Sequence, residues 1–287
     1  MVTIIAGFIV AALLYFRGVV PLWNKYKYSK DIVVLEPAIK RTDLYYGYYS
    51  CFYDQVAETK DHINLFMESQ FQGPDVALDN ILKAGMDTAL DVMFQVYEKV
   101  PGQSESVVRN DAEQRLRDFF TFLRNKGALK YVKILYPSDE PNNTVLNLEE
   151  QQKGTSIVRK VAKEFSDLDG VKLAVIFAAD KEFIGKELYD YVGFDDYDKK
   201  SHVLVNEQYQ KLKQELLPHQ KTIIVPGGAY GQDPTPFVNF AHANSEVGIV
   251  MPFLWYDDPW GGVKALGIRS GALKNAYIAA GHKVIQH

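Results

Sequence analysis

The sequence predicts an α/β fold, a single eight-stranded (β/α)8 TIM barrel that follows an N-terminal hydrophobic helix. Three observations lead to this fold class. From about residue 43 onward, short β-rich apolar runs alternate with amphipathic stretches of helical period, which is typical of successive βα units. The alternation occurs eight times, and eight parallel strands can close on themselves without an exposed edge. The chain has 287 residues, of which 47% are hydrophobic, so one domain can bury a core of this size.

The predicted strands are short runs rich in β-branched and aromatic residues. They are 45–51, 63–67, 88–93, 132–136, 173–177, 191–194, 222–225 and 248–253. The clearest predicted helices are 76–84, 111–126, 149–165, 205–217 and 263–280. Asp111 is placed to cap the start of its helix, and Gly85, Gly127 and Gly170 stand where helix ends favour a left-handed residue.

A doubly wound open sheet is the main competing fold. That fold needs a glycine-rich turn after its first strand to hold a phosphate, and Tyr49-Ser50-Cys51-Phe52 does not resemble one. The run Gly227-Gly228-Ala229-Tyr230-Gly231 after the seventh strand is a second candidate for phosphate binding. No lysine or helix start follows it directly, so a flexible turn is the preferred interpretation.

The N-terminal segment differs in character from the rest of the chain. Val2 to Phe16 is almost wholly apolar, and the apolar character continues to Trp23, which is long enough to cross a bilayer. Nothing basic precedes Val2, and Tyr15-Phe16-Arg17 is a poor cleavage site, so an uncleaved anchor is preferred to a signal peptide. We therefore predict a membrane segment over 1–23, a linker over 24–41 and the barrel over 42–287. A helix buried in an oligomer is the alternative for 1–23.

Composition excludes several classes of function. The formal charge of −4 is spread through mixed-sign segments without a long basic run, so no nucleic-acid partner is expected. The single cysteine, Cys51, excludes multi-cysteine metal sites, and the histidines lack the spacing of metal ligands. We predict no metal and no cofactor. An aldolase or isomerase would need a lysine at a strand end, whereas Lys133 lies inside its strand; this reading stays open as a minor alternative.

Catalytic groups of such barrels stand at the carboxyl ends of the strands, and these positions are acidic and aromatic here. After the fourth strand comes Asp139-Glu140-Pro141. The candidate catalytic residues are Glu140, Asp139 and Asp196. The candidate substrate-binding residues are Tyr48, Glu68, Asp195, Asp198, Tyr230, Trp255 and Asp257. Further tyrosines and tryptophans that could line a cleft are Tyr53, Tyr97, Tyr136, Tyr197 and Trp260.

A glutamate followed by proline at the end of the fourth strand, with a polar residue before it, resembles the acid/base site of the clan A glycoside hydrolase barrels. Trp255 at the end of the eighth strand resembles the sugar platform of the same group. The resemblance implies a glycan substrate and a retaining mechanism. In that mechanism Glu140 protonates the glycosidic oxygen and a second carboxylate attacks the anomeric carbon.

The sequence departs from this pattern in two places. Clan A families carry the nucleophilic glutamate after the seventh strand, where this chain has Val225-Pro226-Gly227-Gly228. The residue before Glu140 is an aspartate instead of the usual asparagine. Three readings stay open. In the first, a carboxylate from the sixth strand (Asp195, Asp196 or Asp198) or Asp257 from the eighth pairs with Glu140.

The second reading is a resemblance to barrel hexosaminidases that use the substrate's own acetamido group as the nucleophile. Asp139 would then orient the amide and Glu140 would act as the acid. In the third reading the barrel binds a glycan without cleaving it. We expect a membrane-anchored, glycosidase-like barrel that hydrolyses a polysaccharide or glycoconjugate; the alternative is a non-catalytic carbohydrate-binding or assembly barrel. The basic residues after the anchor favour a cytoplasmic barrel, but a glycan substrate favours the extracytoplasmic side, which we prefer.

Overall fold

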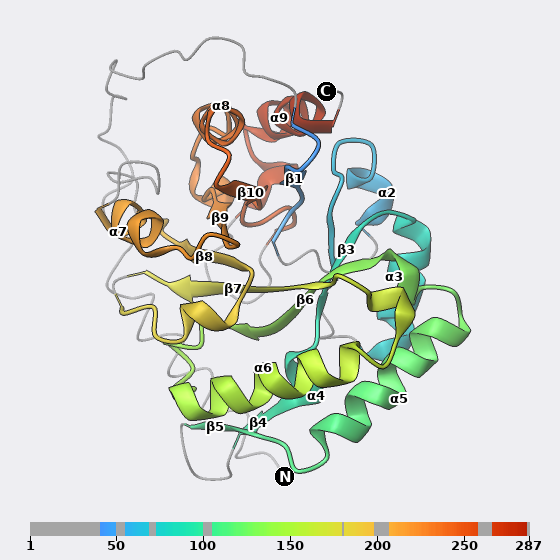
Figure 1. Cartoon of the computed structure of the whole chain (residues 1–287). Coiled ribbons are helices and arrows are strands. Elements are labelled where there is room, and N and C mark those ends of the chain that lie inside the picture. Colours follow the sequence, from blue (N-terminus) through green and yellow to red (C-terminus); the bar gives the residue numbers. More distant parts are fainter. Residues whose placement is uncertain are drawn as a thin grey trace, which may run out of the picture.

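The centre of the molecule is a curled, eight-stranded parallel sheet (Figure 1). The computed structural model describes residues 41–49, 55–68, 73–99, 105–179, 181–197, 207–257 and 266–285. The sheet contains β1 (Tyr45–Tyr46), β2 (Phe66–Glu68), β3 (Thr88–Asp91), β6 (Val132–Asp139), β7 (Lys172–Ala178), β8 (Tyr191–Asp195), β9 (Lys221–Val225) and β10 (Val247–Val250). Each of the eight predicted strands overlaps one of them.

The two ends of the sheet meet. The hydrogen-bonded order is β1-β10-β9-β8-β7-β6-β3-β2, which places β1 and β2 at opposite ends. The backbone N–H groups of Asn64 and Leu65, just before β2, nevertheless donate to the carbonyl oxygen of Tyr46 in β1 at 3.0 and 3.2 Å. These bonds link the first strand to the second, so the sheet has the arrangement of a TIM-like barrel.

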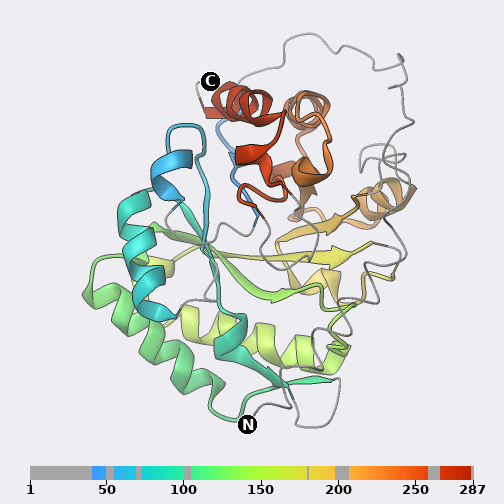
Figure 2. The ribbon, with the colours of Figure 1, turned by 180° about the vertical axis from the view of Figure 1, so that it is seen from behind.

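Helices cover the outside of the sheet (Figures 1 and 2). The longer ones are α3 (Pro74–Ala84), α5 (Ala112–Asn125), α6 (Leu148–Ala162), α7 (Glu207–Glu215), α8 (Thr235–Ala243) and α9 (Lys274–Ile285); α2 (Val56–Thr59) and α4 (Met93–Val96) are short. Four of the five predicted helices are present with small changes in their ends. The fifth, predicted over 263–280, was placed too early, because Ile268–Ser270 forms a separate 3-10 turn and α9 begins only at Lys274.

The sequence analysis missed α8, the two short helices α2 and α4, and an antiparallel hairpin. Helix α8 follows Pro234 and has a second proline, Pro236, in its first turn, where the missing N–H is tolerated. The antiparallel hairpin of β4 (Tyr97–Lys99) and β5 (Ser106–Val108) lies outside the main sheet, beside α6 in Figure 1. The backbone N–H of Val108 donates to the carboxylate of Glu150 on α6, which ties the hairpin to that helix.

The predicted helix-ending glycines have the expected conformation. The φ angles of Gly85, Gly127 and Gly170 are +60°, +75° and +76°. Asp111 does occupy the N-cap position of α5, but its side chain makes no cap hydrogen bond. Its carboxylate accepts instead from Nε of Arg109 at 3.3 Å.

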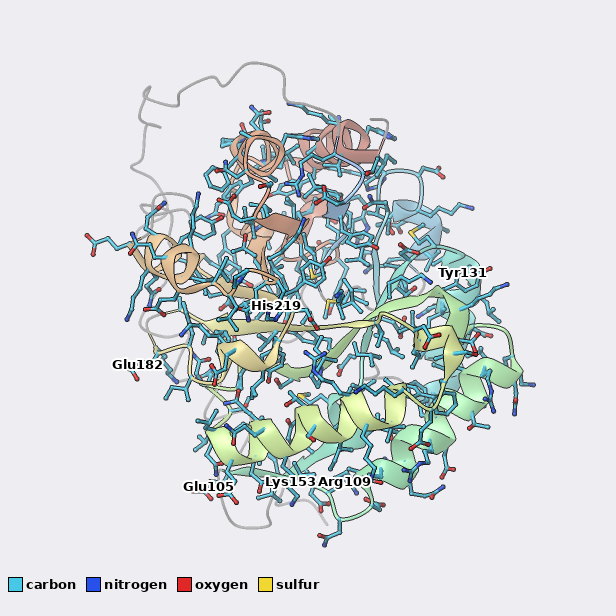
Figure 3. All side chains as sticks on the ribbon, viewed as in Figure 1. Glu105, Arg109, Tyr131, Lys153, Glu182 and His219 are labelled. Carbon is cyan, nitrogen blue, oxygen red and sulfur yellow. The ribbon has the colours of Figure 1, made fainter. Side chains whose placement is uncertain are left out.

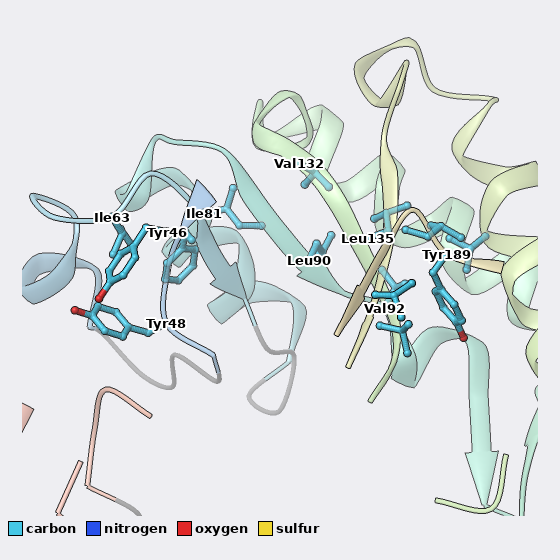
Figure 4. Packing of buried hydrophobic residues seen from close by; sticks show 14 of the residues in the cluster. Tyr46, Tyr48, Ile63, Ile81, Leu90, Val92, Val132, Leu135 and Tyr189 are labelled. Atoms are coloured by element: carbon cyan, nitrogen blue, oxygen red, sulfur yellow. The ribbon is translucent and has the colours of Figure 1, made fainter. Parts of the chain in front are cut away.

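Alternating side chains along the strands build two buried layers. The interior of the barrel is filled by Leu65, Met67, Ala89, Ile134, Tyr136, Ala174, Ile176, Ile223, Val225, Ile249 and Met251. The larger layer lies between strands and helices and includes Leu90, Val132 and Leu135 (Figure 4). Exposed charged side chains such as Lys153 on α6 cover the outer surface (Figure 3). A strand residue can therefore face the mouth of the barrel only if its side chain belongs to the interior layer.

The predicted membrane segment, 1–23, and all of the predicted linker except residue 41 lie outside the described residues. Among the described helices, none is both long enough and apolar enough to cross a bilayer.

Candidate active site at the carboxyl end of the barrel

A β-bulge in β6, the fourth strand of the barrel, turns Asp139 inward. Leu135 pairs with Leu173 of β7, but Ser138 already pairs with Val175, so β6 advances three residues while β7 advances two. Ser138 consequently faces outward, where its hydroxyl contacts the hydroxyl of Tyr189 at 2.9 Å. Bulges of this kind redirect side chains next to active sites. Without the extra residue, Asp139 would face the helices.

Two tyrosines hold the Asp139 carboxylate. The hydroxyls of Tyr49 and Tyr136 both donate to Oδ1 of Asp139, the second at 2.7 Å. Burial raises the pKa of Asp139 to about 6, the hydrogen bond from Tyr49 opposes this rise, and the neighbouring charge of Glu140 adds to it. The two tyrosine donors therefore help Asp139 to keep its charge at neutral pH.

Glu140 occupies a tight turn. Its φ is +41°, in the left-handed region that residues with a side chain seldom adopt. Its N–H donates to the carbonyl of Ile176 in β7 at 2.9 Å, and its own carbonyl accepts the N–H groups of Asn143 and Thr144 at 2.8 and 2.9 Å. These bonds fix an unfavourable backbone conformation, as is common where a side chain must be aimed.

The carboxyl group of Glu140 lies close to that of Asp195, which ends β8, the sixth strand of the barrel. Burial and the negative charge of Glu140 raise the pKa of Asp195 to about 8, with a smaller contribution from Asp139. Asp195 therefore holds a proton at neutral pH.

Asp196 lies on the other face of the same strand. Tyr191 and Tyr197 pack against the barrel interior, whereas Val192 and Phe194 belong to the outer layer. Asp196 has the parity of the outer residues and is 8% exposed. The structure thus brings Asp195, and not Asp196, next to Glu140. Asp198 lies outside the described residues.

Asp91 is a further buried acid that the sequence analysis left out of its candidate residues. It ends β3 with the same parity as Ala89, an interior residue, and is 6% exposed. Its Oδ1 accepts the N–H of Met93 at 2.8 Å. Burial raises the pKa of Asp91 to about 7, the bond from Met93 opposes the rise, and the charge of Asp139 adds to it. The alternation of interior and outer side chains along the strand could have identified Asp91 as an interior residue.

Glu68, a predicted substrate-binding residue, points toward α3 and away from the barrel interior. It is 2% exposed, and Nδ2 of Asn80 donates to its carboxylate at 3.2 Å. Burial raises the pKa of Glu68 to about 8 against this hydrogen bond, and the charge of Asp91 contributes. In the free protein Glu68 is therefore a buried acid between the sheet and a helix.

Glu68→Gln is expected to change how the free energy of unfolding depends on pH. The folded pKa of about 8 exceeds the ordinary value of 4.5, so the wild type loses stability as pH rises from below 4.5 through 8. Between pH 5 and pH 8, the free energy of unfolding of the variant should fall by about 2 to 3 kcal/mol less than that of the wild type. Urea unfolding at several pH values measures it, with Asp79→Asn on the exposed face of α3 as control. A difference from wild type that does not vary with pH would contradict the buried, protonated Glu68.

Aromatic rings stack beside the acidic pair. The ring centroids of Tyr197 and Tyr230 are 4.9 Å apart with planes at 11°, and those of Tyr197 and Phe253 are 5.0 Å apart at 28°. All three side chains are half-buried. Phe253 packs on the interior side, as Ile249 and Met251 do. Its N–H donates to the Pro226 carbonyl at 2.8 Å. The sequence analysis singled out Tyr197 and Tyr230 but not Phe253.

Tyr48 and Trp255 are core residues in this structure. Each is 1% exposed, and their ring centroids lie 4.7 Å apart. Nε1 of Trp255 donates to Glu58 of α2 at 3.0 Å, and Figure 4 shows Tyr48 among buried side chains beside Tyr46. A sugar could stack on neither ring without displacing the core, so the aromatic surface at the mouth comes from Tyr197, Tyr230 and Phe253 instead.

Asp257 organises the segment after β10. Its carboxylate accepts the N–H of Gly267 and the hydroxyl of Ser270, both at 2.8 Å, and lies 3.5 Å from the guanidinium of Arg269. These three partners engage both carboxylate oxygens. Among the described residues, no group of three or more His, Cys, Asp or Glu side chains has an arrangement that could hold a metal ion.

Comparison with known proteins identifies the fold. No protein-family model and no curated protein matches this sequence. Among solved structures, a GH2 β-galacturonidase from Eisenbergiella tayi bound to galacturonate matches 87% of the chain and 52% of its own length, with a TM-score of 0.55 and 12% identity. An FMN-binding β-glucuronidase from Facaelibacterium prausnitzii L2-6 matches 82% of the chain and 41% of its own length, with a TM-score of 0.54 and 11% identity.

A third similar structure is a β-glucuronidase from Ruminococcus gnavus, matched over 83% of this chain and 49% of its own, with a TM-score of 0.52 and 10% identity. The chain thus spans about half or less of the length of these enzymes. At 10 to 12% identity the likeness concerns the fold alone. The chain therefore shares the barrel fold of the matched part of these structures.

Proposed function

We propose that this barrel hydrolyses a glycosidic bond of a polysaccharide or glycoconjugate, with Glu140 and Asp195 as the acid/base pair. The observation that carries the proposal is that the carboxyl groups of Glu140 and Asp195 lie close together at the carboxyl ends of β6 and β8. The glycosidase-like fold and the half-buried rings of Tyr197, Tyr230 and Phe253 beside the pair support it.

Glycoside hydrolysis needs one carboxyl group that is protonated and one that is ionised. The proton goes to the leaving oxygen, and the negative charge stabilises the positive charge on the sugar ring. Asp195, whose pKa is raised to about 8, holds a proton at neutral pH, and Glu140 is the neighbouring carboxyl group that would carry the negative charge. A bound substrate would separate the two groups, and the aromatic faces next to them would contact the apolar face of its sugar ring.

The nature of the sugar can be tested directly. The similar structures are described as β-glucuronidases and a β-galacturonidase. The described mouth of this barrel carries Asp91, Asp139, Glu140 and Asp195, and a uronic acid would meet their like charges. We therefore expect neutral or amino sugars to be cleaved faster than uronic acids. The test is release of nitrophenol from a panel of neutral, amino and uronic nitrophenyl glycosides; no release from any of them would count against hydrolysis.

The pH dependence of hydrolysis should follow the proton of the pair. Because the folded pKa of Asp195 is raised to about 8, Asp195 keeps its proton below that pH and loses it above. We expect kcat/KM to fall about tenfold per pH unit above pH 8. The profile should be measured for the wild type and for Asp257→Asn, which should show the same basic limb. A flat profile from pH 7 to 10 would contradict proton donation by this pair.

Carbohydrate binding without cleavage is the second candidate function. The loop after β9 carries no carboxylate from Val225 to Gly231, and Gly227 there donates its N–H to the side-chain oxygen of Gln232. This reading predicts glycan affinity without release of reducing sugar, and affinity that survives Glu140→Gln. The substrate-assisted reading requires Asp139 to contact an acetamido group, and predicts that only N-acetylated sugars are cleaved.

We also retain the prediction that 1–23 anchors the barrel to a membrane, with the barrel on the extracytoplasmic side. The motivation is the apolar run in the sequence together with a glycan substrate. Protease protection in membrane vesicles tests the side.

A further inference from the structure

The loops after β6 and β7 are bonded to each other close to Glu140. The Oδ1 atom of Asn142 accepts the N–H of Ala178 at 2.9 Å, and its Nδ2 donates to the carbonyl of the same residue at 2.9 Å. Nδ2 of Asn142 also donates to the carbonyl of Glu182 at 3.5 Å; Glu182 is labelled at the edge of the molecule in Figure 3. The β7 loop is therefore held in register with the turn that aims Glu140.

Lys181, in the same loop, fixes the orientation of a second amide. Its Nζ donates to Oδ1 of Asn143 at 2.9 Å and to the carbonyl of Asn142 at 3.4 Å. An ammonium group can only donate, so the amide of Asn143 must turn its oxygen toward Lys181. Its Nδ2 then faces Glu140 and donates to Oε2 at 2.8 Å. The chain of contacts runs from Lys181 through Asn143 to Glu140 and from there to Asp195.

This chain of contacts favours the ionised form of Glu140. A hydrogen bond to a carboxylate is stronger than one to a neutral carboxylic acid, and the ammonium of Lys181 adds a positive charge beyond the amide. The neighbours that act on Asp195, by contrast, include the negative charges of Glu140 and Asp139, which favour the protonated form of Asp195. The single proton of the pair is therefore more stable on Asp195 than on Glu140.

We propose that Asn143 and Lys181 are positioning residues that keep Glu140 ionised and leave the proton of the pair on Asp195. The inference rests on the proposed function and deepens it by giving Glu140 and Asp195 different roles in hydrolysis. Asp195 gives its proton to the glycosidic oxygen, which keeps the electron pair of the broken bond, while Glu140 carries the negative charge beside the sugar ring. Water then supplies the hydroxyl of the released sugar, and the remaining proton of that water returns to Asp195. The resemblance from the sequence implied the reverse role for Glu140.

Titration of the two carboxyl groups tests the proposal without any substrate. The carboxyl carbons of Glu140 and Asp195 are followed by carbon-13 NMR against pH in the whole barrel, with Glu140→Gln and Asp195→Asn used to assign the signals. In the wild type at neutral pH, the carboxyl carbon of Asp195 should have the chemical shift of a protonated carboxylic acid. In Lys181→Met, the midpoint of the pair should rise by about half a unit, and part of the proton should move to Glu140.

Matched variants separate this effect from a structural one. Lys181→Arg keeps the charge and the donors, so it should restore the wild-type titration. Lys172→Met removes an exposed lysine at the start of β7, at the opposite end of the barrel, and should change nothing. Asn143→Leu should raise the midpoint at least as far as Lys181→Met.

The outcomes distinguish the two proposals. An unchanged midpoint in both Lys181→Met and Asn143→Leu overturns the positioning role, whether or not the protein hydrolyses glycosides. A proton on Glu140 in the wild type overturns it as well. The expected shift in a protein that cleaves no glycoside supports the positioning role and rejects the proposed hydrolysis.

Discussion

Glu140→Gln is expected to lower kcat/KM for glycoside hydrolysis by roughly 1000-fold, or about 4 kcal/mol of transition-state stabilisation. Glutamine has nearly the same shape, and its amide can still bond to Asn143 and Asp195, the two side chains that contact Glu140. It cannot carry the negative charge that an oxocarbenium-like transition state requires. The loss should appear in kcat, because the substrate still binds.

Asp195→Asn is the informative companion. It should be as inactive as Glu140→Gln on a substrate whose leaving group needs a proton. On a dinitrophenyl glycoside, whose leaving group needs none, Asp195→Asn should recover most of its activity and Glu140→Gln should not. The melting temperatures of both variants should be compared with that of Asp257→Asn, which changes a carboxylate in the loop after β10. Full activity in Glu140→Gln would remove the pair from the mechanism.

The strands of this fold were predictable because their signal is local. Period-two alternation and β-branched composition mark each strand within its own few residues, and all eight were found in this way. The hairpin of β4 and β5 gave no such signal. Its stability comes from contacts with α6, such as the bond from Val108 to Glu150, which join residues 42 positions apart.

The candidate site was predictable only where the regular alternation of side chains along a strand shows which residues face the barrel interior. Tyr191 and Tyr197 facing the interior imply that Asp195 faces it too, so the choice between Asp195 and Asp196 could have been made from the alternation in the sequence. Asp139 is different, because it points inward only through the bulge between Leu135 and Ser138. The bulge itself is a property of the pairing with β7, and its one mark in the sequence of β6 is Pro137, a residue that central strands accept only at such irregularities.

The aromatic residues show a second limit. Phe253 and Trp255 follow the same strand and are equally large and apolar, yet Phe253 is half-buried at the mouth and Trp255 is enclosed by Tyr48 and His62. The difference arises from β1 and α2, which pack over the chain after β10. Local sequence can therefore indicate an aromatic mouth but cannot identify which ring a sugar would reach.

Gly47→Ala is expected to destabilise the fold severely. Gly47 follows β1, where the barrel closes against the start of β2, and its N–H donates to Val250 of β10 at 3.2 Å. A methyl group at this position would lie 2.1 Å from the carbonyl oxygen of Leu65. That oxygen belongs to the backbone and cannot rotate away, so β1 and β2 would have to move apart.

We expect Gly47→Ala to cost at least about 4 kcal/mol of unfolding free energy, which is at the high end for a single substitution and could prevent folding. Gly170→Ala is the matched control. Gly170 has a φ of +76° and no atom within 4 Å of the added methyl group, so only backbone strain of about 1 kcal/mol is expected there. Urea unfolding of the two variants compares the cost of a steric collision between β1 and the start of β2 with the cost of backbone strain alone. If Gly47→Ala cost no more than Gly170→Ala, the close approach of β1 and β2 would be wrong, and the sheet would be open at that edge.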